Sequence, residues 1–320
     1  MTRLRWGLIG CGDIVRKRVA SALSSGPRSE LRALSRARAE LAHEFARAYD
    51  ARVFSDWRDM LRSDEIDAVY IATPVYLHCE QAVEAALNGK HVLCEKPMAL
   101  DVSECDRMIT ACAGARVKLG VAYYRHLYPL VHRIRSLVME GIIGKPVLAC
   151  VEAYERFNPQ PGSDRYWLLE PEKSGGGPMM DFGCHRIEIL LDVLGPIDGV
   201  SSMHKNSFFD RRVEDTTVAS FDFASGALAT LTCTHAAIEP CDSFDLYCTN
   251  GSIHVETLNK GSLKLVTQSG VVEEIHAPAP NLHQPIIDDF VDSVLNDRPP
   301  AVDGSKGRAV SEILDRIYTR

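Results

Sequence analysis

Residues 4–15 read LRWGLIGCGDIV, a short apolar run that leads into two glycines and then into a helix-like stretch. Gly10 permits the tight turn at the end of a strand, and Gly12 lets the backbone approach a pyrophosphate at the free N–H groups of the next helix. Asp13 and Ile14 start that helix and belong to the same predicted phosphate loop. The order of strand, glycine turn and helix predicts a dinucleotide-binding βαβ unit.

The rest of the chain divides into two patterns. Short apolar runs alternate with helix-like stretches through about the first 120 residues, which predicts a Rossmann domain with a doubly wound parallel sheet over residues 1–121. From residue 147 onward the runs are longer, and Ser225-Gly226, Asn250-Gly251 and Ser269-Gly270 are typical of hairpin turns. We therefore expect residues 122–320 to form a second, α/β domain with a large, open, mostly antiparallel sheet. Its two C-terminal helices are free to pack back on the first domain.

The end of the second predicted strand distinguishes two cofactors. An NAD site usually has an acid there, about 20 residues beyond the glycines, to bind the ribose hydroxyls. Here Ser35 and Arg36 follow the strand, with Arg38 two residues on. A hydroxyl and two guanidiniums suit a 2′-phosphate, because arginine offers charge and paired donors. We favour NADP(H), with NAD(H) as the alternative; a solvated basic face would explain the arginines without any cofactor.

Two further loops follow predicted strands. Thr73-Pro74 ends one strand before a helix that begins at His78, and Glu95-Lys96-Pro97 ends the next. In a doubly wound sheet, ligands bind beyond the carboxyl ends of the strands, so these loops are expected to contact the nucleotide. Lys96 could shuttle a proton or donate a hydrogen bond to a substrate hydroxyl, although an exposed lysine paired with Glu95 is the simpler interpretation.

Residues 175–185 read GGGPMMDFGCH. We expect the glycines to let the backbone pass close to a cofactor or substrate. Asp181 and His185 are four residues apart, so both lie on one face of the predicted helix. A capped helix with a buried histidine is the alternative.

Composition excludes several classes of protein. The net charge of −7 argues against a general nucleic-acid binder. No apolar run is long enough to cross a membrane, and the N-terminus lacks the order of a signal peptide. Ten cysteines without framework spacing indicate reduced thiols in a cytoplasmic protein, and no cluster has metal-ligand spacing, so no metal is expected.

Three segments together resemble the Gfo/Idh/MocA family over nearly the whole chain: GLIGCGDI, ATPVYLHCEQAVEAALNGKHVLCEKPMAL and SGGGPMMDFGCHRIEILLDVLG. The resemblance implies nicotinamide-dependent oxidation or reduction of a sugar, polyol or related hydroxy compound. It also implies that the second domain, residues 122–320, binds the substrate and forms a homodimer or homotetramer through its sheet. Two departures from the family pattern are Val15 at the third fingerprint position and the lack of an acid after the second strand.

The resemblance also implies the site. The family's catalytic lysine maps onto Lys96 and its Asp-x-x-x-His onto Asp181 and His185. The segment around Tyr124 and Arg125, and the loop with Arg165 and Trp167, match substrate-side segments, and Tyr154 is a further candidate for the sugar site.

Hydride transfer to or from a carbinol carbon needs a group that takes or gives the hydroxyl proton. We expect His185 to be the general acid/base, Asp181 to orient it, and Lys96 to hydrogen-bond the substrate oxygen; whether histidine or lysine carries the proton stays open. A biliverdin-reductase-like, amino-acid or trans-dihydrodiol dehydrogenase is one alternative. A non-catalytic NAD(P)-binding sensor on the same fold is another.

Overall fold

A computed structural model describes residues 2–36 and 45–319 of the chain. The chain divides into two compact units. The first comprises Met1–Tyr124 with Pro280–Ser311, and the second comprises Arg125–Ala279 with Glu312–Arg320. This division differs from a single boundary after residue 121, because the segment Pro280–Ser311 returns to the first unit.

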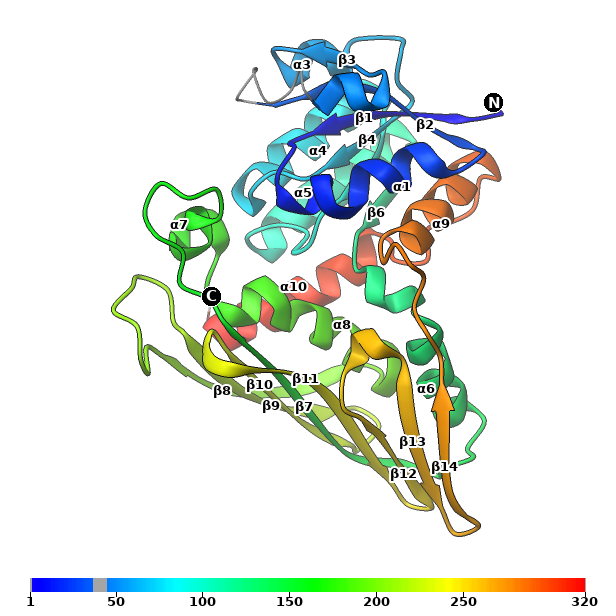
Figure 1. Ribbon diagram of the computed structural model, residues 1–320, viewed down its shortest axis with the longest axis vertical. Coiled ribbons are helices and arrows are strands. Elements are labelled where there is room, and N and C mark those ends of the chain that lie inside the picture. Colours follow the sequence, from blue (N-terminus) through cyan, green and yellow to red (C-terminus); the bar gives the residue numbers. More distant parts are fainter. Residues whose placement is uncertain (1, 37–44, 320) are drawn as a thin grey trace. The chain divides into compact units, whose positions relative to one another are not determined.

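The first unit contains a six-stranded parallel sheet in the order β3-β2-β1-β4-β5-β6 (Figure 1). Its strands are β1 Leu4–Ile9, β2 Ser29–Ser35, β3 Arg52–Phe54, β4 Ala68–Ile71, β5 His91–Cys94 and β6 Leu119–Val121. The helices of this unit are α1 Ala20–Ser25, α3 Trp57–Leu61, α4 His78–Leu87, α5 Val102–Ala115, α9 Gln284–Leu295 and the first half of α10 Gly304–Tyr318.

The parallel strands are buried on both faces, as crossover helices require. All four residues of β4 are buried, and in β1 only Arg5 is partly exposed. The returning helix α9 covers part of this sheet, since the ring of Phe290 packs 5.5 Å from that of Trp6. α5 begins at an N-cap, where the Asp101 carboxylate accepts the N–H of Glu104.

The second unit contains an eight-stranded sheet in the order β14-β13-β12-β11-β7-β10-β9-β8, in which only β7 and β10 are parallel neighbours. Its strands are β7 Pro146–Arg156, β8 Ile197–Lys205, β9 Thr216–Phe223, β10 Leu228–Thr234, β11 Ala236–Cys248, β12 Gly251–Val255, β13 Ser262–Thr267 and β14 Gly270–Ile275. Its helices are α6 Pro129–Met139, α7 Pro171–Ser174 and α8 Cys184–Leu194.

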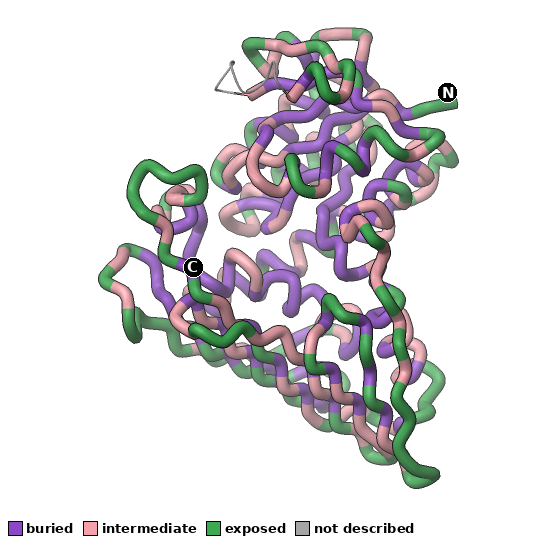
Figure 2. The backbone as a smooth tube through the Cα atoms, viewed as in Figure 1, coloured by how far each residue is buried: buried purple, intermediate pink, exposed green. Residues whose placement is uncertain are grey.

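Burial alternates along the strands of this second sheet, as Figure 2 shows. In β9 and β10, every second residue is buried and those between are exposed or partly exposed. A period of two places the buried residues on one face, and α8 is buried along most of its length. The other face of the sheet carries the exposed positions. None of the described helices combines the length and apolar composition needed to cross a bilayer.

Candidate active site

In the first unit, the predicted cofactor residues gather beyond the carboxyl ends of neighbouring parallel strands. The N–H of Gly10 donates to the carbonyl of Ser35 at 2.9 Å, which joins the turn after β1 to the end of β2. The N–H of Ala72 donates to Ile9 at 2.8 Å and that of Glu95 to Ile71 at 2.9 Å, so β4 and β5 end at the same edge. This is the edge at which doubly wound sheets bind ligands.

The two glycines of the loop have different surroundings. Gly10 has φ +90°, and a Cβ there would lie 2.6 Å from the carbonyl oxygen of Ala72, so glycine is required by the fold. A Cβ on Gly12 would meet no atom of the described chain within 4 Å. The backbone of Gly12 is therefore open to close approach by a phosphate, and the residues present fit a dinucleotide.

Val15 is fully buried and starts a π-helical turn, Val15–Val19, within the first helix. The fold thus buries a branched side chain where the fingerprint expects Gly or Ala. Asp13 lies in the first turn of the same helix and is ion-paired with Lys17 at 2.7 Å.

The end of β2 places positive charge near the glycine turn. Burial raises the pKa of the Cys11 thiol to about 11, and the charges of Arg36 and Arg16 oppose this rise. Ser35 is buried, with its carbonyl engaged by Gly10. The predicted contact of Arg38 lies outside the described residues.

His78 joins the two loops that follow β4 and β5. Its Nε2 lies 2.9 Å from the carbonyl oxygen of Thr73 and its Nδ1 lies 3.0 Å from that of Pro97. Only 1% of His78 is exposed, and burial lowers the pKa of its imidazole. The structure thus gives His78 a bridging role within the protein, and direct contact with the cofactor stays a prediction. Thr73 donates its hydroxyl proton to Gln81 at 2.7 Å.

Glu95 anchors the loop that carries Lys96. Its carboxylate accepts the hydroxyl of Tyr70 at 2.7 Å and the N–H of Lys96 at 3.2 Å. His283 Nε2 lies 3.5 Å from Oε1, a distance for an electrostatic contact rather than a hydrogen bond. Burial raises the pKa of Glu95, but His283, Lys96 and Tyr70 outweigh burial and the net pKa is lowered. Glu95 is 7% exposed, and the alternative of a Lys96 side chain paired with it stays a prediction.

In the second unit, Gly176 and Gly177 pack against the chain itself. A Cβ on Gly176 would lie 2.5 Å from the ring of Tyr318, and one on Gly177 would overlap the carbonyl oxygen of Glu214. The N–H of Gly177 donates to Glu214 Oε1 at 3.0 Å. The close approach that Gly176 and Gly177 permit is thus to Tyr318 and Glu214, and the expected approach to a cofactor or substrate stays a prediction.

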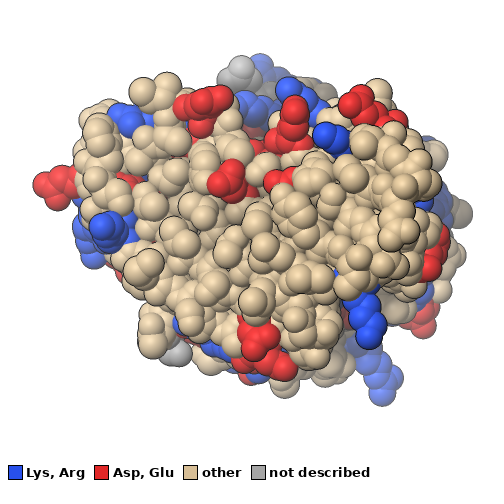
Figure 3. Space-filling view, turned by 90° about the horizontal axis from the view of Figure 1, so that it is seen from below, with Lys and Arg blue, Asp and Glu red and all other residues tan. Residues whose placement is uncertain are grey.

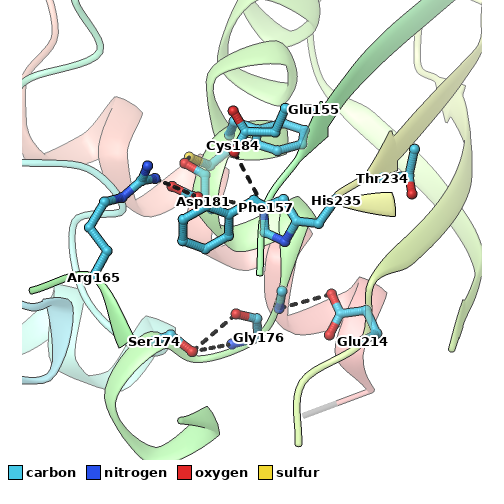
Figure 4. Close-up of polar contacts among 12 residues, drawn as sticks. Glu155, Phe157, Arg165, Ser174, Gly176, Asp181, Cys184, Glu214, Thr234 and His235 are labelled. Atoms are coloured by element: carbon cyan, nitrogen blue, oxygen red, sulfur yellow. Dashed lines mark hydrogen bonds and ion pairs between the residues drawn. The ribbon is translucent and has the colours of Figure 1, made fainter. Parts of the chain in front are cut away.

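The glycine run leads into a π-helical turn, Met179–Gly183, that carries Asp181 (Figure 4). Asp181 Oδ2 lies 3.5 Å from a guanidinium nitrogen of Arg165 and 3.5 Å from Nε2 of His235. Glu155 Oε1 lies 3.7 Å from the same nitrogen of His235. Ligand atoms of Glu155, Asp181 and His235 all lie within 4.8 Å of one another, a set that could hold a metal ion, so the expected absence of a metal site stays a prediction.

His185 follows on α8 and is 3% exposed. The predicted role of Asp181 in orienting His185 is not tested by these contacts. It stays a prediction, as do the catalytic roles of His185 and Lys96.

The predicted substrate residues fall in different places. Arg165 stacks over Phe157, 4.2 Å from the ring centroid, beside Asp181. Trp167 packs on a small cluster that includes Phe157 and Leu168. Tyr154 donates to Glu152 at 2.7 Å, and the alternation of β7 places it on the opposite face from Glu155. The structure therefore does not bring Tyr154 to the Asp181 group.

Two other predicted substrate residues are buried. Arg125 is 5% exposed and ion-paired with Asp242 at 3.0 Å, and Arg186 pairs with the same carboxylate oxygen. Tyr124 stacks on His283, with ring centroids 4.3 Å apart. These contacts explain both residues as parts of the fold, and their contact with substrate stays a prediction.

Sequence reasoning missed Glu155 and His235. Both continue the inward-facing series of their strands, which runs 149, 151, 153 in β7 and 229, 231, 233 in β10. Tyr154 pairs with Thr234 in the parallel register, so the next residues, Glu155 and His235, are neighbours. An acid and a histidine at inward positions of otherwise apolar series were the signal that could have found them.

Comparisons with known proteins agree with this architecture. Residues 4–123 match the family described as "Oxidoreductase family, NAD-binding Rossmann fold", and residues 131–254 match the GFO/IDH/MocA C-terminal domain. The chain belongs to the Gfo/Idh/MocA family. It is an NAD(P)-dependent oxidoreductase that transfers a hydride between nicotinamide C4 and a carbinol or carbonyl carbon.

Two curated relatives match over most of their length. 1,5-anhydro-D-fructose reductase from Ensifer adhaerens is 28% identical over 95% of this chain and 92% of its own. D-xylose 1-dehydrogenase [NADP(+)] from Haloarcula marismortui is 28% identical over 98% and 90%. The crystal structure of the WlbA dehydrogenase from Bordetella pertussis, in complex with NADH and UDP-GlcNAcA, superposes with a TM-score of 0.88 at 26% identity, covering 99% of this chain and 95% of that one.

Proposed function

We propose that this family member oxidises or reduces a sugar, polyol or related hydroxy compound, and that Lys96, Asp181 and His185 carry its proton chemistry. The observation that carries the proposal is the Asp181 carboxylate, held between Arg165 and His235 on the turn that leads into His185. Relatives named for anhydrofructose, xylose and a nucleotide sugar support the substrate class.

Each residue has a distinct task in this proposal. The bound nicotinamide supplies or accepts the hydride at C4. An imidazole exchanges protons near neutral pH, so His185 takes the hydroxyl proton during oxidation and returns it during reduction. Asp181 orients that imidazole and stabilises its cationic form. Lys96 donates a hydrogen bond to the substrate oxygen, on a loop that the buried Glu95 holds through the Lys96 N–H.

The test is a screen of aldoses, inositols, sugar acids, keto-sugars and dihydrodiols that follows the absorbance of the reduced nicotinamide. With a substrate in hand, K96M and H185A are expected to lose about 10²–10⁴-fold in kcat, the usual worth of general acid–base groups. K118M is the matched lysine control, because Lys118 is paired with Asp297 beyond the site. Near-full turnover by K96M or H185A contradicts the roles; cofactor binding with no turnover across the panel favours the non-catalytic sensor.

For the cofactor we infer a preference for NADP(H). The charge of Arg36 near the glycine turn supports it, as does the lack of an acid after β2. Similar proteins use either cofactor: the xylose dehydrogenase is named for NADP(+), and the WlbA complex holds NADH. Replacing Arg36 with Asp is expected to raise KM for NADP(H) about tenfold or more, because one charge-assisted contact is worth about 1.5–3 kcal/mol. A wild-type preference for NAD(H) contradicts the inference.

We also propose that copies of the chain associate, as a homodimer or homotetramer, through the open face of the eight-stranded sheet. Figure 3 looks onto a broad surface with few charged side chains at its centre. Exposed apolar residues of the sheet support this: Met203, Val218, Leu228 and Tyr247. Such a face is typical of a protein interface. V218E with L228E is expected to yield monomers in light scattering, whereas a monomeric wild type contradicts the proposal.

The ten cysteines all lie in the described part of the chain and are free thiols. Free thiols are typical of a reducing compartment, which supports the predicted cytoplasmic location.

A further inference from the structure

The imidazole of His235 is fully buried between two groups of opposite charge. Its Nδ1 lies 2.9 Å from a guanidinium nitrogen of Arg211, and its Nε2 faces the carboxylates of Asp181 and Glu155. The rings of Phe157 and Phe182 pack against it, with centroids 4.9 and 5.2 Å away. His235 follows β10, and Figure 4 shows its ring beside Asp181 and below Glu155.

Arg211 decides which nitrogen of His235 carries the proton. A guanidinium has five N–H donors and no acceptor, so Nδ1 must accept with its lone pair. In a neutral imidazole the proton is then on Nε2. Arg211 cannot readily turn away, because it also donates to the carbonyl oxygens of Phe157 at 2.9 Å and Glu214 at 2.7 Å. The tautomer of His235 is therefore fixed from the side opposite Asp181.

This tautomer bears on the two functions that the group could have. A metal ion would need a lone pair on Nε2, which would move the proton to Nδ1, against the N–H of Arg211. The Arg211 contact thus opposes metal binding by Glu155, Asp181 and His235. With the proton on Nε2, the ring is instead a donor to carboxylates. The distances to Asp181 and Glu155, 3.5 and 3.7 Å, correspond to electrostatic contacts between the N–H and the two carboxylates.

We propose that His235, with its proton fixed by Arg211, is a positioning residue for Asp181. The buried N–H keeps the Asp181 carboxylate ionised and holds its rotamer, since a donor to the charged form favours that form. The charged groups around the imidazole are Arg165 beside Asp181, Glu155 on β7, Arg211, and the carboxyls of Glu214 and Asp215 near Arg211. This proposal rests on the proposed catalytic role of Asp181.

The first test needs neither substrate nor cofactor. Protein labelled with ¹⁵N in the histidine rings is examined by long-range ¹H–¹⁵N correlation at neutral pH, and H235Q identifies the His235 signals by their loss. The expected pattern is the Nε2–H tautomer. In R211M, which lacks the donor, we expect a mixture of tautomers. An Nδ1–H tautomer in the wild type overturns the proposal, whatever the reaction proves to be.

The second test measures function. H235F removes the donor but keeps the ring volume, and we expect kcat to fall about 10–100-fold, at the low end for groups that assist acid–base catalysis. The acid limb of the pH–rate profile for oxidation, which His185 sets as the base, is expected to move to lower pH, because a less well-placed Asp181 stabilises the cationic form of His185 less. H235Q keeps an N–H near the same place and is expected to restore both the rate and the limb. A wild-type profile in H235F overturns the proposal.

Three controls distinguish the positioning role of His235 from an effect on folding and from metal binding. H254Q removes a histidine that contacts Asp245 at 2.8 Å on the other face of the sheet, and it is expected to leave the pH profile unchanged. Unchanged thermal unfolding of H235Q shows that the fold is intact. In calorimetry, Zn²⁺ or Mn²⁺ binding that is lost in E155Q overturns the proposal in favour of a metal site. If no substrate is found, the proposed function fails, but the tautomer test still decides whether the proposal about His235 is correct.

Discussion

The hydroxyl of Tyr318, the second-last described residue, donates to Oε1 of Glu214 at 2.5 Å. The same carboxylate oxygen accepts the N–H of Gly177. The C-terminus of the chain is thereby linked to the turn that precedes Asp181. The glycines leave room for this contact, because side chains at 176 and 177 would occupy the space of Tyr318 and Glu214.

Alanine substitutions at the two glycines are expected to differ. In G177A the new Cβ meets a backbone oxygen that cannot move alone, so we expect a loss of about 1–3 kcal/mol in the free energy of unfolding, as for other overpacked sites. In G176A the obstacle is the Tyr318 side chain, which can rotate, so the loss is expected to be smaller. Urea denaturation of both variants measures the difference. Equal losses would contradict this account of the glycine run.

A salt bridge in the second unit makes stability depend on pH. Arg133 donates two hydrogen bonds to Glu274, both at 2.8 Å, and this pairing is the main cause that lowers the pKa of Glu274 from 4.5 to about 2. A lowered carboxyl pKa stabilises the fold above pH 4.5, and the stabilisation is lost as pH falls toward 2. Because the pair borders solvent, we expect E274Q to cost only about 1 kcal/mol near neutral pH.

Glu273, the exposed neighbour of Glu274, provides the control variant. E273Q removes the same charge from the same strand, β14, without removing the Arg133 pair. The difference in unfolding free energy between E274Q and the wild type should shrink as pH falls from 4.5, whereas E273Q should track the wild type. A difference that is constant with pH would contradict the pairing.

We expect Glu95 to contribute both to the stability of the fold and to cofactor binding through the Lys96 loop. E95Q neutralises a buried carboxylate that contacts Tyr70, His283 and the N–H of Lys96. We expect a loss of about 1–3 kcal/mol in the free energy of unfolding, the cost of weakened hydrogen bonds to a buried charged group, and weaker cofactor binding. Y70F removes one donor and leaves the loop contact, so it should lower stability but affect cofactor binding less. Cofactor titration of both variants measures the second effect.

Much of the fold could be predicted from local patterns. The apolar run at residues 4–9 is β1, and the three hairpin turns with glycine join β9 to β10, β11 to β12 and β13 to β14. These features depend on nearest neighbours and on periods of two or four, which a sequence displays directly. The return of α9 to the first unit depends on contacts such as Trp6 with Phe290, nearly 300 residues apart in the chain, and no local pattern encodes them.

The residues of the candidate site likewise divide into those that short motifs reveal and those that only the tertiary fold brings together. Lys96, Asp181 and His185 were recognised because they lie in short motifs. Glu155 and His235 come from different strands, and Arg211 from a loop, so only the parallel register of β7 with β10 and the return of the Arg211 loop bring them together. Tyr154 was named as a candidate for the sugar site because the face of an aromatic ring can stack on a sugar. The two-residue period of β7 instead places Glu155 on the inward face and Tyr154 on the opposite face.

The two glycines of the phosphate loop allow fold and cofactor binding to be separated. G10A places a Cβ at φ +90° and 2.6 Å from the carbonyl of Ala72, so we expect it to lower the free energy of unfolding by about 1–3 kcal/mol, the usual cost of a strained backbone residue. G12A meets no protein atom, so its thermal unfolding should match that of the wild type. Its Cβ would instead obstruct the pyrophosphate, and we expect Kd for the nicotinamide cofactor to rise about tenfold, equivalent to about 1.4 kcal/mol. Differential scanning calorimetry and fluorescence titration measure the two effects on the same preparations. A G12A protein that binds cofactor as tightly as the wild type would show that the dinucleotide does not approach this turn.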